Sequence, residues 1–354
     1  MPRSLKVFKD RDYLLAEGGL FFCVVGYTHP PDRVVSYLKY APAEEGEWGT
    51  ADRRFKRMLP YYTIPHISNT LDYLRVAFPG CVFYDPYSKT SFSAVPVESI
   101  VGHFCPEEKL QRLLKEERRD RLEEAAVKLV SILSERSGVS EDFFGVTGSI
   151  LIGIHRPTVS DIDLIVLGRE NSLKVKAALL NLYSSEGSPI KKFSGVQLEE
   201  WCEAKVRLYP LTRREAEVIY DRVWNRGVFN GVNFSVHPVR LDWEVADIYG
   251  GKTFNNLGLV EVEATVEDAV DSLFLPATYR VAEVRIKSGV RVEGVREVVS
   301  FEGLYGGIYQ KGETVLARGV LEEVREVSSG EVYCRVVVGS LAAGGMDFIR
   351  LKGQ

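Results

Sequence analysis

The chain has 354 residues, of which 45% are hydrophobic and 27% charged, and its formal net charge is -4. This length and balance indicate a folded protein with two or three domains and exclude a disordered or fibrous chain. The net charge gives no general attraction for nucleic acid, so any such contact requires a local basic patch. No apolar run reaches the ~18 residues of a membrane span, and the N-terminal residues lack the apolar centre of a signal peptide, so we predict a cytoplasmic protein without a membrane partner.

Five cysteines are spread along the chain without a C-x-x-C pair, namely Cys23, Cys81, Cys105, Cys202 and Cys334. Structural zinc sites usually draw on closely spaced pairs of cysteines. We therefore predict buried thiols in place of a structural zinc site. Glutamine is scarce while Glu, Arg and Lys are plentiful, a bias that is typical of thermophilic proteins.

Residues 1–105 alternate extended segments with Pro-Pro and Gly-rich breaks. One helix is expected near residues 69–78 (NTLDYLRVAF), and the segment as a whole is predicted to be an N-terminal α+β domain. Its densest basic run, beside aromatic residues, consists of Arg53, Arg54, Lys56 and Arg57. Such a run can bind phosphates and stack bases, so it is the predicted contact for RNA. The alternative is that the aromatic residues serve only as good strand formers.

Residues 106–250 begin with a helical pattern. Apolar residues from Leu122 to Leu133 recur at i, i+3 and i+4 spacing, and this helix is predicted to end near Gly138. A strand with the sequence FFGV, a short helix and the strand DIDLIVLG are expected next. Further on, the T-R-R-E segment that begins at Thr212 predicts a capping box at a helix start.

Residues 251–354 change to short alternating strands separated by glycines, with no convincing helix. This pattern is typical of a small β-barrel or sandwich. The predicted fold class is therefore α+β, with a central domain of mixed sheet and helices over residues 106–250. An N-terminal α+β domain (1–105) and a C-terminal all-β, barrel-like domain (251–354) flank it.

Two aspartates in the central domain stand at i and i+2 of the predicted strand DIDLIVLG. Asp161 and Asp163 therefore share a face, about 7 Å apart at Cα. Two carboxylates so close repel each other and lose hydration unless a positive group lies between them. A hard divalent cation such as Mg²⁺ is the natural partner, because it binds carboxylate oxygens together with substrate phosphates.

A second motif lies just upstream, where Thr147, Gly148 and Ser149 follow the predicted strand FFGV. Glycine allows backbone amides to approach a phosphate closely, and the serine hydroxyl adds a donor. The two motifs together predict one site, in which a phosphate cradle faces a pair of carboxylates that hold a metal.

The Gly148-Ser149 pair, the spacer and the Asp161-Ile162-Asp163 motif, preceded by Ser160, resemble the signature of the DNA polymerase beta-like nucleotidyltransferase superfamily. The whole chain is also similar to a group of uncharacterised archaeal proteins catalogued as predicted nucleotidyltransferases. The segments that carry this second resemblance are RDYLLAEGGLFFCVVGYTHPPDRVVSYLKYAP, DSLFLPATY and EVVSFEGLYGG.

The resemblance implies a nucleotidyltransferase-like core and transfer of a nucleoside monophosphate from NTP to an acceptor hydroxyl. An RNA 3′ end is the first choice of acceptor, and a protein or a small molecule is the alternative. It also implies two Mg²⁺ (or Mn²⁺) ions bound with the NTP, on Asp161 and Asp163, and pyrophosphate as the leaving group. The nucleotide would be held by Gly148, Ser149 and Ser160.

The chain departs from the family pattern where a third carboxylate is expected. The next predicted strand, residues 231–240 (GVNFSVHPVR), has no acid, and His237 takes the corresponding place. Imidazole is a poor ligand for Mg²⁺, and such a histidine often only satisfies local hydrogen bonds. Asp242 and Glu244 lie just beyond, and Asp242 is the better placed candidate for the third catalytic acid. Without a third acid, the chain would be a degenerate module that binds nucleotide or RNA without turnover.

A second departure is the absence of an arginine directly after the Gly-Ser pair, where Ile150 stands. Positive charge for the triphosphate must then come from elsewhere. Arg156, on the spacer together with His155, is the preferred candidate for binding the nucleotide, because an arginine fork matches phosphate oxygens.

Overall fold

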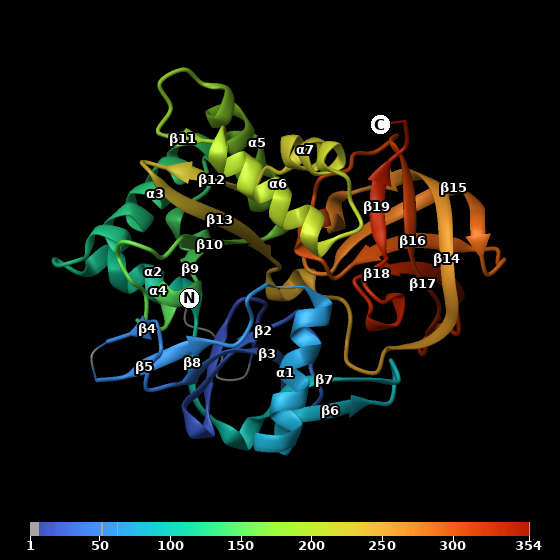
Figure 1. Cartoon of the computed structure of the whole chain (residues 1–354), viewed down its shortest axis with the longest axis horizontal. Helices are drawn as coiled ribbons and strands as arrows, with labels where there is room; N and C mark the ends of the chain where they lie inside the picture. The colour runs from blue at the N-terminus through green and yellow to red at the C-terminus, as the bar shows by residue number, and fades with distance from the viewer. Residues whose placement is uncertain (1–6, 51, 62, 354) are drawn as a thin grey trace. The chain divides into compact units, whose positions relative to one another are not determined.

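The computed structural model of the chain describes residues 7–50, 52–61 and 63–353 (Figure 1). Within these residues the protein is an α+β fold with three sheets and seven α-helices. The chain divides into two compact units, each built from separate segments. Unit 1 comprises residues 1–59, 94–193 and 224–246, and unit 2 comprises residues 60–93, 194–223 and 247–354.

The first sheet contains most of the strands of the N-terminal region. Six strands of unit 1 have the order β4-β5-β3-β2-β1-β8. Their bounds are Tyr13–Ala16 (β1), Leu20–Val24 (β2), Arg33–Pro42 (β3), Trp48–Gly49 (β4), Arg54–Arg57 (β5) and Ile100–Phe104 (β8). The end of β7 (Thr90–Pro96) pairs with β3, and its beginning pairs with β6 (Val82–Asp85) of unit 2.

The second sheet forms the core of unit 1 and has the order β11-β12-β13-β10-β9. Its strands are Phe144–Val146 (β9), Ile162–Leu167 (β10), Ile190–Lys191 (β11), Arg226–Phe229 (β12) and Val232–Val239 (β13). Strand β10 lies between β9, which is antiparallel to it, and β13, which is parallel to it (Figure 1).

Four helices belong to unit 1, namely Pro106–Lys115 (α2), Arg121–Ser137 (α3), Gly148–Leu151 (α4) and Arg169–Ser184 (α5). Helices α3 and α5 contact each other and the central strand β10. The predicted helix over Leu122–Leu133 is confirmed, and its end is set by Gly138 in the left-handed conformation, which glycine adopts without a steric penalty. The predicted strands DIDLIVLG and GVNFSVHPVR are confirmed as β10 and β13.

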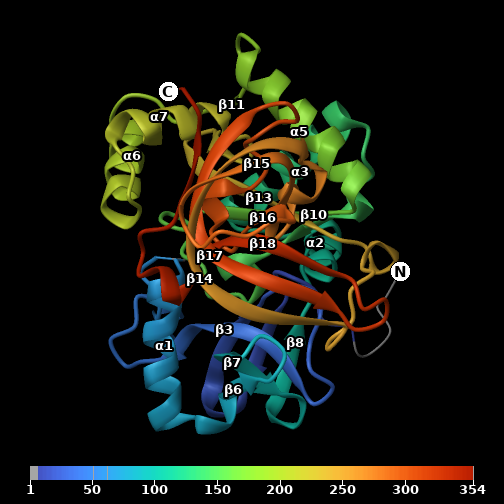
Figure 2. The same ribbon diagram turned by 90° about the vertical axis from the view of Figure 1, so that its right-hand side faces the viewer.

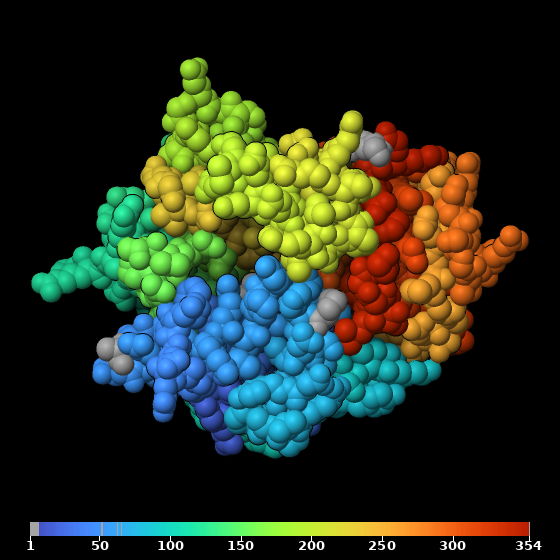
Figure 3. All heavy atoms as spheres, viewed as in Figure 1, coloured from blue at the N-terminus to red at the C-terminus, as the bar shows by residue number. Residues whose placement is uncertain are grey.

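Unit 2 contains Ile64–Ala77 (α1), Val196–Leu208 (α6) and Arg213–Arg222 (α7). Helix α1 covers the predicted segment as far as Ala77 and begins earlier. It has a proline in its first turn, where the missing amide hydrogen costs nothing. Helices α6 and α7 contact each other and lie at the surface (Figure 3). The capping box at the start of α7 is confirmed, since Thr212 and Glu215 exchange both hydrogen bonds.

The third sheet holds the C-terminal strands and has the order β14-β15-β16-β18-β17-β19, with an additional pairing of β14 and β17, which run side by side (Figure 2). Their bounds are Lys252–Asp268 (β14), Ala277–Gly289 (β15), Val295–Ser300 (β16), Thr314–Glu326 (β17), Val332–Val338 (β18) and Phe348–Leu351 (β19). Alternate residues of β14 are buried, as the period of a strand with one covered face requires. The predicted lack of α-helix after residue 250 is confirmed for the described residues.

The units do not follow the three contiguous segments predicted from sequence. The predicted boundary at residue 250 lies close to residue 247, where the last segment of unit 2 begins, whereas the boundary at residue 105 falls inside unit 1. In the described part of the chain, no helix has both the length and the apolar character that crossing a membrane requires. All five cysteines are buried and unpaired with one another, which confirms the prediction of buried thiols.

Candidate functional site

The predicted aspartate pair lies in unit 1 at the start of β10. Asp161 precedes the strand and is exposed, and Asp163 is its second residue, with a side chain that is 31% exposed. The residues between and after them, Ile162 and Leu164, are buried. The alternation of the strand therefore places both carboxylates on the face that solvent can reach.

Strand β13 brings polar side chains to this face, because it runs parallel to β10 with Ser235 opposite Asp163. Ser235 Oγ donates a hydrogen bond of 2.5 Å to Asp163 Oδ1 and lies 2.8 Å from His237 Nε2. His237 Nε2 itself is 3.9 Å from Asp163 Oδ1. Asn233, two residues earlier, hydrogen-bonds Asp161. The structure thus gathers both aspartates and the polar face of β13 in one place.

The two carboxyl groups differ in their pKa. Burial and the nearby charge of Asp163 raise the pKa of Asp161 to about 6, although its side chain reaches solvent at the rim of the site. Positive charge from Arg226 and Arg57 acts in the opposite direction but does not outweigh them. At neutral pH the pair therefore carries two negative charges at a measurable cost in free energy.

Asp163 is held in its ionised form. Burial alone would raise the pKa of Asp163. The polar edge of the His237 ring, the charge of Lys39 and the hydrogen bond from Ser235 outweigh burial and keep this pKa well below its usual range. Burial and the neighbouring charge of Arg11 lower the pKa of His237 to about 4. The imidazole is therefore neutral at pH 7, and its Nε2–H can donate to Ser235 Oγ, which in turn donates to Asp163.

The first residue of α4, Gly148, packs directly against Asp163. Gly148 has φ of +69°, and a Cβ at this position would lie 2.4 Å from Asp163 Oδ2. Both observations require glycine, because any side chain would be strained and would displace the carboxylate. Thr147 N donates to the Asp163 carbonyl at 2.9 Å, which ties the turn to β10. The predicted neighbourhood of the Gly-Ser motif and the aspartates is therefore present in the structure.

The other predicted nucleotide-binding residues are Ser149, Ser160 and Arg156. Ser149 is buried in α4, which has only four residues, so little helix dipole is available to a phosphate there. Ser160 is also buried, and its Oγ accepts a hydrogen bond of 2.9 Å from the Arg156 amide, which closes the spacer loop. The Arg156 side chain is exposed. His155 Nε2 is 2.7 Å from Asp120 Oδ2, so its ring is committed to the start of α3.

The structure does not bring Asp242 to the aspartate pair. Strands β10 and β13 are parallel, Asp163 is level with Ser235, and Asp242 comes after the opposite end of β13, in a 3-10 turn with Glu244. Four further register positions separate Ser235 from Val239, which is roughly 13 Å along the strand. Asp242 instead pairs with Lys9 at 2.7 Å.

Glu244 does not reach the pair either. It accepts hydrogen bonds from the Arg169 amide at 2.8 Å and the Leu241 amide at 3.0 Å. Its position at the start of α5 is that of a capping residue, which satisfies amides that have no partner inside the helix. Of the candidates for the third acid, only His237 lies beside Asp163, where the sequence analysis placed it.

Positive charge reaches the pair from residues that sequence reasoning did not connect with it. Lys39 on β3 acts on Asp163, and Arg226 on β12 is directly opposite Ser235. Lys39 is only 6% exposed, and its Nζ lies 5.2 Å from the centroid of the Tyr13 ring. A lysine inside an apolar strand is the signal that could have identified it, because a buried lysine usually has a partner.

The predicted basic run lies on and beside β5 and is exposed at Arg53, Arg54, Lys56 and Arg57. The Arg57 guanidinium is 5.4 Å from the Trp48 ring centroid, and that of Arg53 is 5.3 Å from the Phe55 ring centroid. Such stacking holds an arginine in place at low cost in free energy. Arg57 also lowers the pKa of Asp161, so one member of the run acts electrostatically on the carboxylate pair.

The residues at this site fit a divalent cation with oxygen ligands. Asp161 and Asp163 offer carboxylates on one face, and the pKa of Asp161 is raised by burial and by repulsion from Asp163, which a bound cation would relieve. His237 does not complete the ligand set in its present position, because its Nε2 is already within hydrogen-bond distance of Ser235 Oγ. The pair therefore fits a cation that takes its remaining ligands from water or phosphate.

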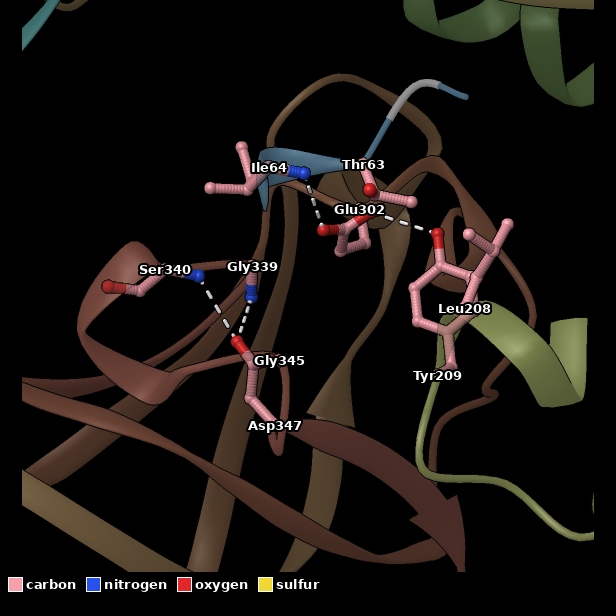
Figure 4. A pocket seen from close by; sticks show the side chains of 9 residues that line it. All are labelled: Thr63, Ile64, Leu208, Tyr209, Glu302, Gly339, Ser340, Gly345 and Asp347. Carbon is pink, nitrogen blue, oxygen red and sulfur yellow. Dashed lines mark hydrogen bonds between the residues drawn. The ribbon is translucent and has the colours of Figure 1, made fainter. Parts of the chain in front are cut away.

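Unit 2 has a small polar pocket of a different kind, with a volume of about 10 Å³, which is room for about one water (Figure 4). Glu302 accepts hydrogen bonds from the Ile64 amide at 3.0 Å and from the Tyr209 hydroxyl at 2.9 Å. Asp347 accepts from the amides of Gly339 and Ser340. Both carboxylates already accept hydrogen bonds from the chain itself, so we interpret this pocket as structural.

Fold and site together define an α+β protein with a carboxylate pair at the start of a central strand. The chain is 30% identical over 355 residues to the uncharacterized protein MJ1086 of Methanocaldococcus jannaschii, and the match covers 97% of this chain and 98% of that protein. The chain therefore belongs to the same archaeal family as MJ1086, which confirms the predicted resemblance to uncharacterised archaeal proteins. No family model and no solved structure matches the chain.

Proposed function

We propose that this protein is a metal-dependent nucleotidyltransferase that transfers a nucleoside monophosphate from NTP to an acceptor hydroxyl, with an RNA 3′ end as the first choice. The observation that carries the proposal is the contact between the Gly148 turn and Asp163, on the face that Asp163 shares with Asp161. A structural carboxylate pair would have no need of a glycine turn pressed against it. A nucleotide site needs both, since the turn accommodates phosphate and the pair accommodates the cation.

The order of elements supports a nucleotidyltransferase-like core in unit 1. Strand β9, the Gly-Ser turn and β10 follow in sequence, and β13 is the neighbouring strand from which the superfamily supplies its third acid. In unit 2, the pairing of β14 with both β15 and β17 supports the proposed barrel-like sheet, because it joins the two ends of the five-strand series β14-β15-β16-β18-β17.

The proposed reaction joins the acceptor oxygen to the α-phosphorus and breaks the bond from that phosphorus to the oxygen that bridges to the β-phosphate. Pyrophosphate leaves with the bond electrons. When bound, Mg²⁺ or Mn²⁺ would stabilise the charge on the attacking and leaving oxygens. Asp161 and Asp163 would hold the cations, and a second ion would depend mainly on the triphosphate for its ligands. Asp161, which is ionised at neutral pH because its pKa is about 6, would accept the proton of the acceptor hydroxyl.

The cations around the pair would bind the triphosphate. Lys39 and Arg226 lie near Asp163 and its partner Ser235, and Arg57 acts on Asp161. The exposed side chains of Arg53, Arg54 and Lys56 extend this positive charge along β5, where RNA could bind through its phosphates. Exposed Arg156 remains a further candidate for the nucleotide.

One observation favours a second function, that of a nucleotide- or RNA-binding module without turnover. The face of β13 that meets the aspartates carries Asn233, Ser235 and His237 and no carboxylate, and Ser235 is hydrogen-bonded to Asp163. Two ions that share a pair of carboxylates are held less firmly than two ions with three. The retained repulsion between Asp161 and Asp163 supports the catalytic proposal, because a binding module gains nothing from it.

The decisive experiment incubates the full-length protein with each α-labelled NTP, Mg²⁺ or Mn²⁺ and bulk RNA, and it measures label transfer and pyrophosphate release. Transfer should fall more than about 100-fold in Asp161→Asn and in Asp163→Asn, since even residues that only orient metal ligands cost 10- to 100-fold. The matched control is Glu186→Gln, an exposed acid on a loop of the same unit, and it should transfer label like the wild type. NTP binding without transfer under all conditions would establish the module in place of the enzyme.

A further inference from the structure

A second cluster of potential metal ligands lies in unit 1, where the first sheet begins. Asp12 comes just before β1, and β1 pairs with β8 so that Leu14 is opposite His103. Cys105 follows β8 directly, and it shares a face with His103 two residues earlier. The topology therefore brings a carboxylate, an imidazole and a thiol from residues 12, 103 and 105 to one point.

The distances within this cluster are those of ligands around one ion. His103 Nε2 lies 2.9 Å from Asp12 Oδ2 and 3.7 Å from Cys105 Sγ, and the three ligand atoms all lie within 4.8 Å of one another. A tetrahedral zinc ion with Zn–N of about 2.0 Å and Zn–S of about 2.3 Å separates its nitrogen and sulfur ligands by roughly 3.5 Å. The contact between Asp12 and His103 would widen by only a few tenths of an ångström.

The same geometry argues against a catalytic cysteine with a histidine relay. In such a relay the acid binds one ring nitrogen and the nucleophile binds the other, so that a proton can pass across the ring. Here both Asp12 Oδ2 and Cys105 Sγ approach the same Nε2 atom of His103. Three ligand atoms gathered this closely can instead surround a single metal ion.

We propose that Asp12, His103 and Cys105 form a zinc site with three protein ligands and a fourth position open to solvent. Asp12 is fully buried, Cys105 is 6% exposed, and the His103 side chain is 28% exposed, so an ion would enter along the imidazole. The Lys9 amide donates to Asp12 Oδ2 at 3.0 Å and orients the carboxylate. Thiolate and imidazole with one carboxylate suit zinc better than magnesium.

A second group of three, formed by Asp120, Glu123 and His155, does not support the same inference. Asp120 Oδ1 accepts from the amides of Leu122 and Glu123, and Glu123 reaches back to the Asp120 amide, so the acids form the capping box of α3. The group also has no sulfur ligand. This difference allows the two clusters to be distinguished by spectroscopy.

Zinc binding at the proposed site forms a Zn–S bond and releases the proton of the Cys105 thiol, while a ring nitrogen of His103 and a carboxylate oxygen of Asp12 donate electron pairs. Affinity should therefore rise with pH as long as the thiol must lose its proton. The proposal is independent of the nucleotidyltransferase chemistry, because it shares no ligand with Asp161 or Asp163.

The test titrates the metal-free, full-length protein with Co²⁺, a spectroscopic substitute for Zn²⁺. One Co²⁺ per chain should give a sulfur-to-cobalt charge-transfer band in the near ultraviolet, because a Co²⁺ at the aspartate pair would have no sulfur ligand. Zn²⁺ should abolish the band. Cys105→Ser should lose the band. His103→Gln should weaken Co²⁺ binding more than about 100-fold, since substitution of residues that only orient metal ligands already lowers metal affinity by about 10- to 100-fold. Cys334→Ser, a buried thiol of unit 2, and Asp163→Asn should both keep the band.

Circular dichroism of each variant without metal shows whether it folds. If Cys105→Ser fails to fold, alkylation of the wild type followed by mass spectrometry replaces it, and Zn²⁺ should slow the labelling of Cys105 but not that of Cys334. A folded wild type without the charge-transfer band would overturn the proposal. A band that persists in folded Cys105→Ser, or equal labelling of Cys105 with and without Zn²⁺, would do the same.

Discussion

Two pairs of carboxylates, one in each unit, show how the same groups can be structural or available for a ligand. In unit 2, burial and the nearby charge of Asp347 raise the pKa of Glu302, yet Glu302 and Asp347 each accept two hydrogen bonds from the chain (Figure 4). In unit 1, Asp163 is held by Ser235, whereas Asp161 stays exposed, close to a like charge.

A raised pKa alone does not separate the two cases. Burial raises the pKa of Glu302, as burial raises that of Asp161. The two carboxyl groups differ in their hydrogen-bond donors and in their exposure to solvent. Glu302 is 5% exposed and accepts hydrogen bonds from the Ile64 amide and the Tyr209 hydroxyl. Asp161 keeps part of its surface for a ligand. We infer that the unit 2 pair contributes to stability, whereas Asp161 of the unit 1 pair reduces stability and in exchange is available for binding.

The largest expected effect concerns Glu302. Glu302→Ala leaves two half-buried donors without an acceptor. Each such loss costs about 1 to 3 kcal/mol for a buried donor and less where water can reach the donor, so the free energy of unfolding should fall by about 2 to 4 kcal/mol. Urea denaturation measures this free energy of unfolding. Glu302→Gln keeps one carbonyl acceptor and should lose less. A Glu302→Ala variant as stable as the wild type would show that the unit 2 pair does not contribute in this way.

The next effect concerns Ser235, which connects Asp163 to His237. Ser235→Ala removes the hydrogen bond that orients the Asp163 carboxylate, so the affinity for Mn²⁺ at the aspartate pair should fall by about 10- to 100-fold. Isothermal titration in the presence of NTP measures this affinity. Ser185→Ala, an exposed serine that caps its own helix, is the control and should bind Mn²⁺ like the wild type. Unchanged Mn²⁺ affinity in Ser235→Ala would place the cation elsewhere.

The third effect is on stability and depends on pH. The pKa of Asp161 in the folded protein, about 6, lies above its ordinary value of 3.8, so the folded state binds this proton more tightly than the unfolded chain does. Stability is therefore lost as the pH rises from about 4 to about 6, and the loss is complete above that range. Asp161→Asn should make the metal-free protein more stable at pH 8, by less than about 1 kcal/mol because solvent screens the exposed group, and should have no effect below pH 4.

Asp163 gives the opposite sign, which provides the control for this experiment. Its pKa lies below the ordinary value in the folded protein, so its charge stabilises the fold above about pH 4. Asp163→Asn should therefore destabilise the metal-free protein at pH 8. Thermal unfolding at pH 4 and pH 8 tests both variants. Equal effects of the two substitutions at pH 8 would contradict the assigned difference between the carboxylates.

The smallest effect concerns Arg57, whose charge lowers the pKa of Asp161 from β5. Arg57→Ala should raise the pH midpoint of Mn²⁺ binding by roughly a few tenths of a unit at low salt, and salt should reduce the difference. The comparison variant is Arg54→Ala, which changes an exposed arginine of the same strand that is not among the main influences on the pKa of Asp161. A shift of the same size in Arg54→Ala would show only a general effect of net charge.

Local sequence patterns predicted the elements that carry the site. The β-branched residues of DIDLIVLG and the glycine that bounds them were sufficient to predict β10, and strand geometry then gave the shared face of Asp161 and Asp163. The T-R-R-E segment was sufficient to predict the start of α7. Such patterns depend on neighbours within a few positions, where backbone geometry dictates which side chains meet. The same reasoning explains why Asp242 could not be placed, since its location depends on the parallel register of β10 and β13.

By itself, then, the sequence determined a strand with two acids on one face, a glycine turn before it and a polar face on a later strand. Only the tertiary structure decided that Gly148 presses against Asp163, that Ser235 and His237 stand where a third acid was sought, and that Lys39 supplies charge. It also decided that residues 12, 103 and 105 meet. The physical reason is that strand pairing joins segments far apart in the chain, and the register of each pair is set by packing of the whole sheet.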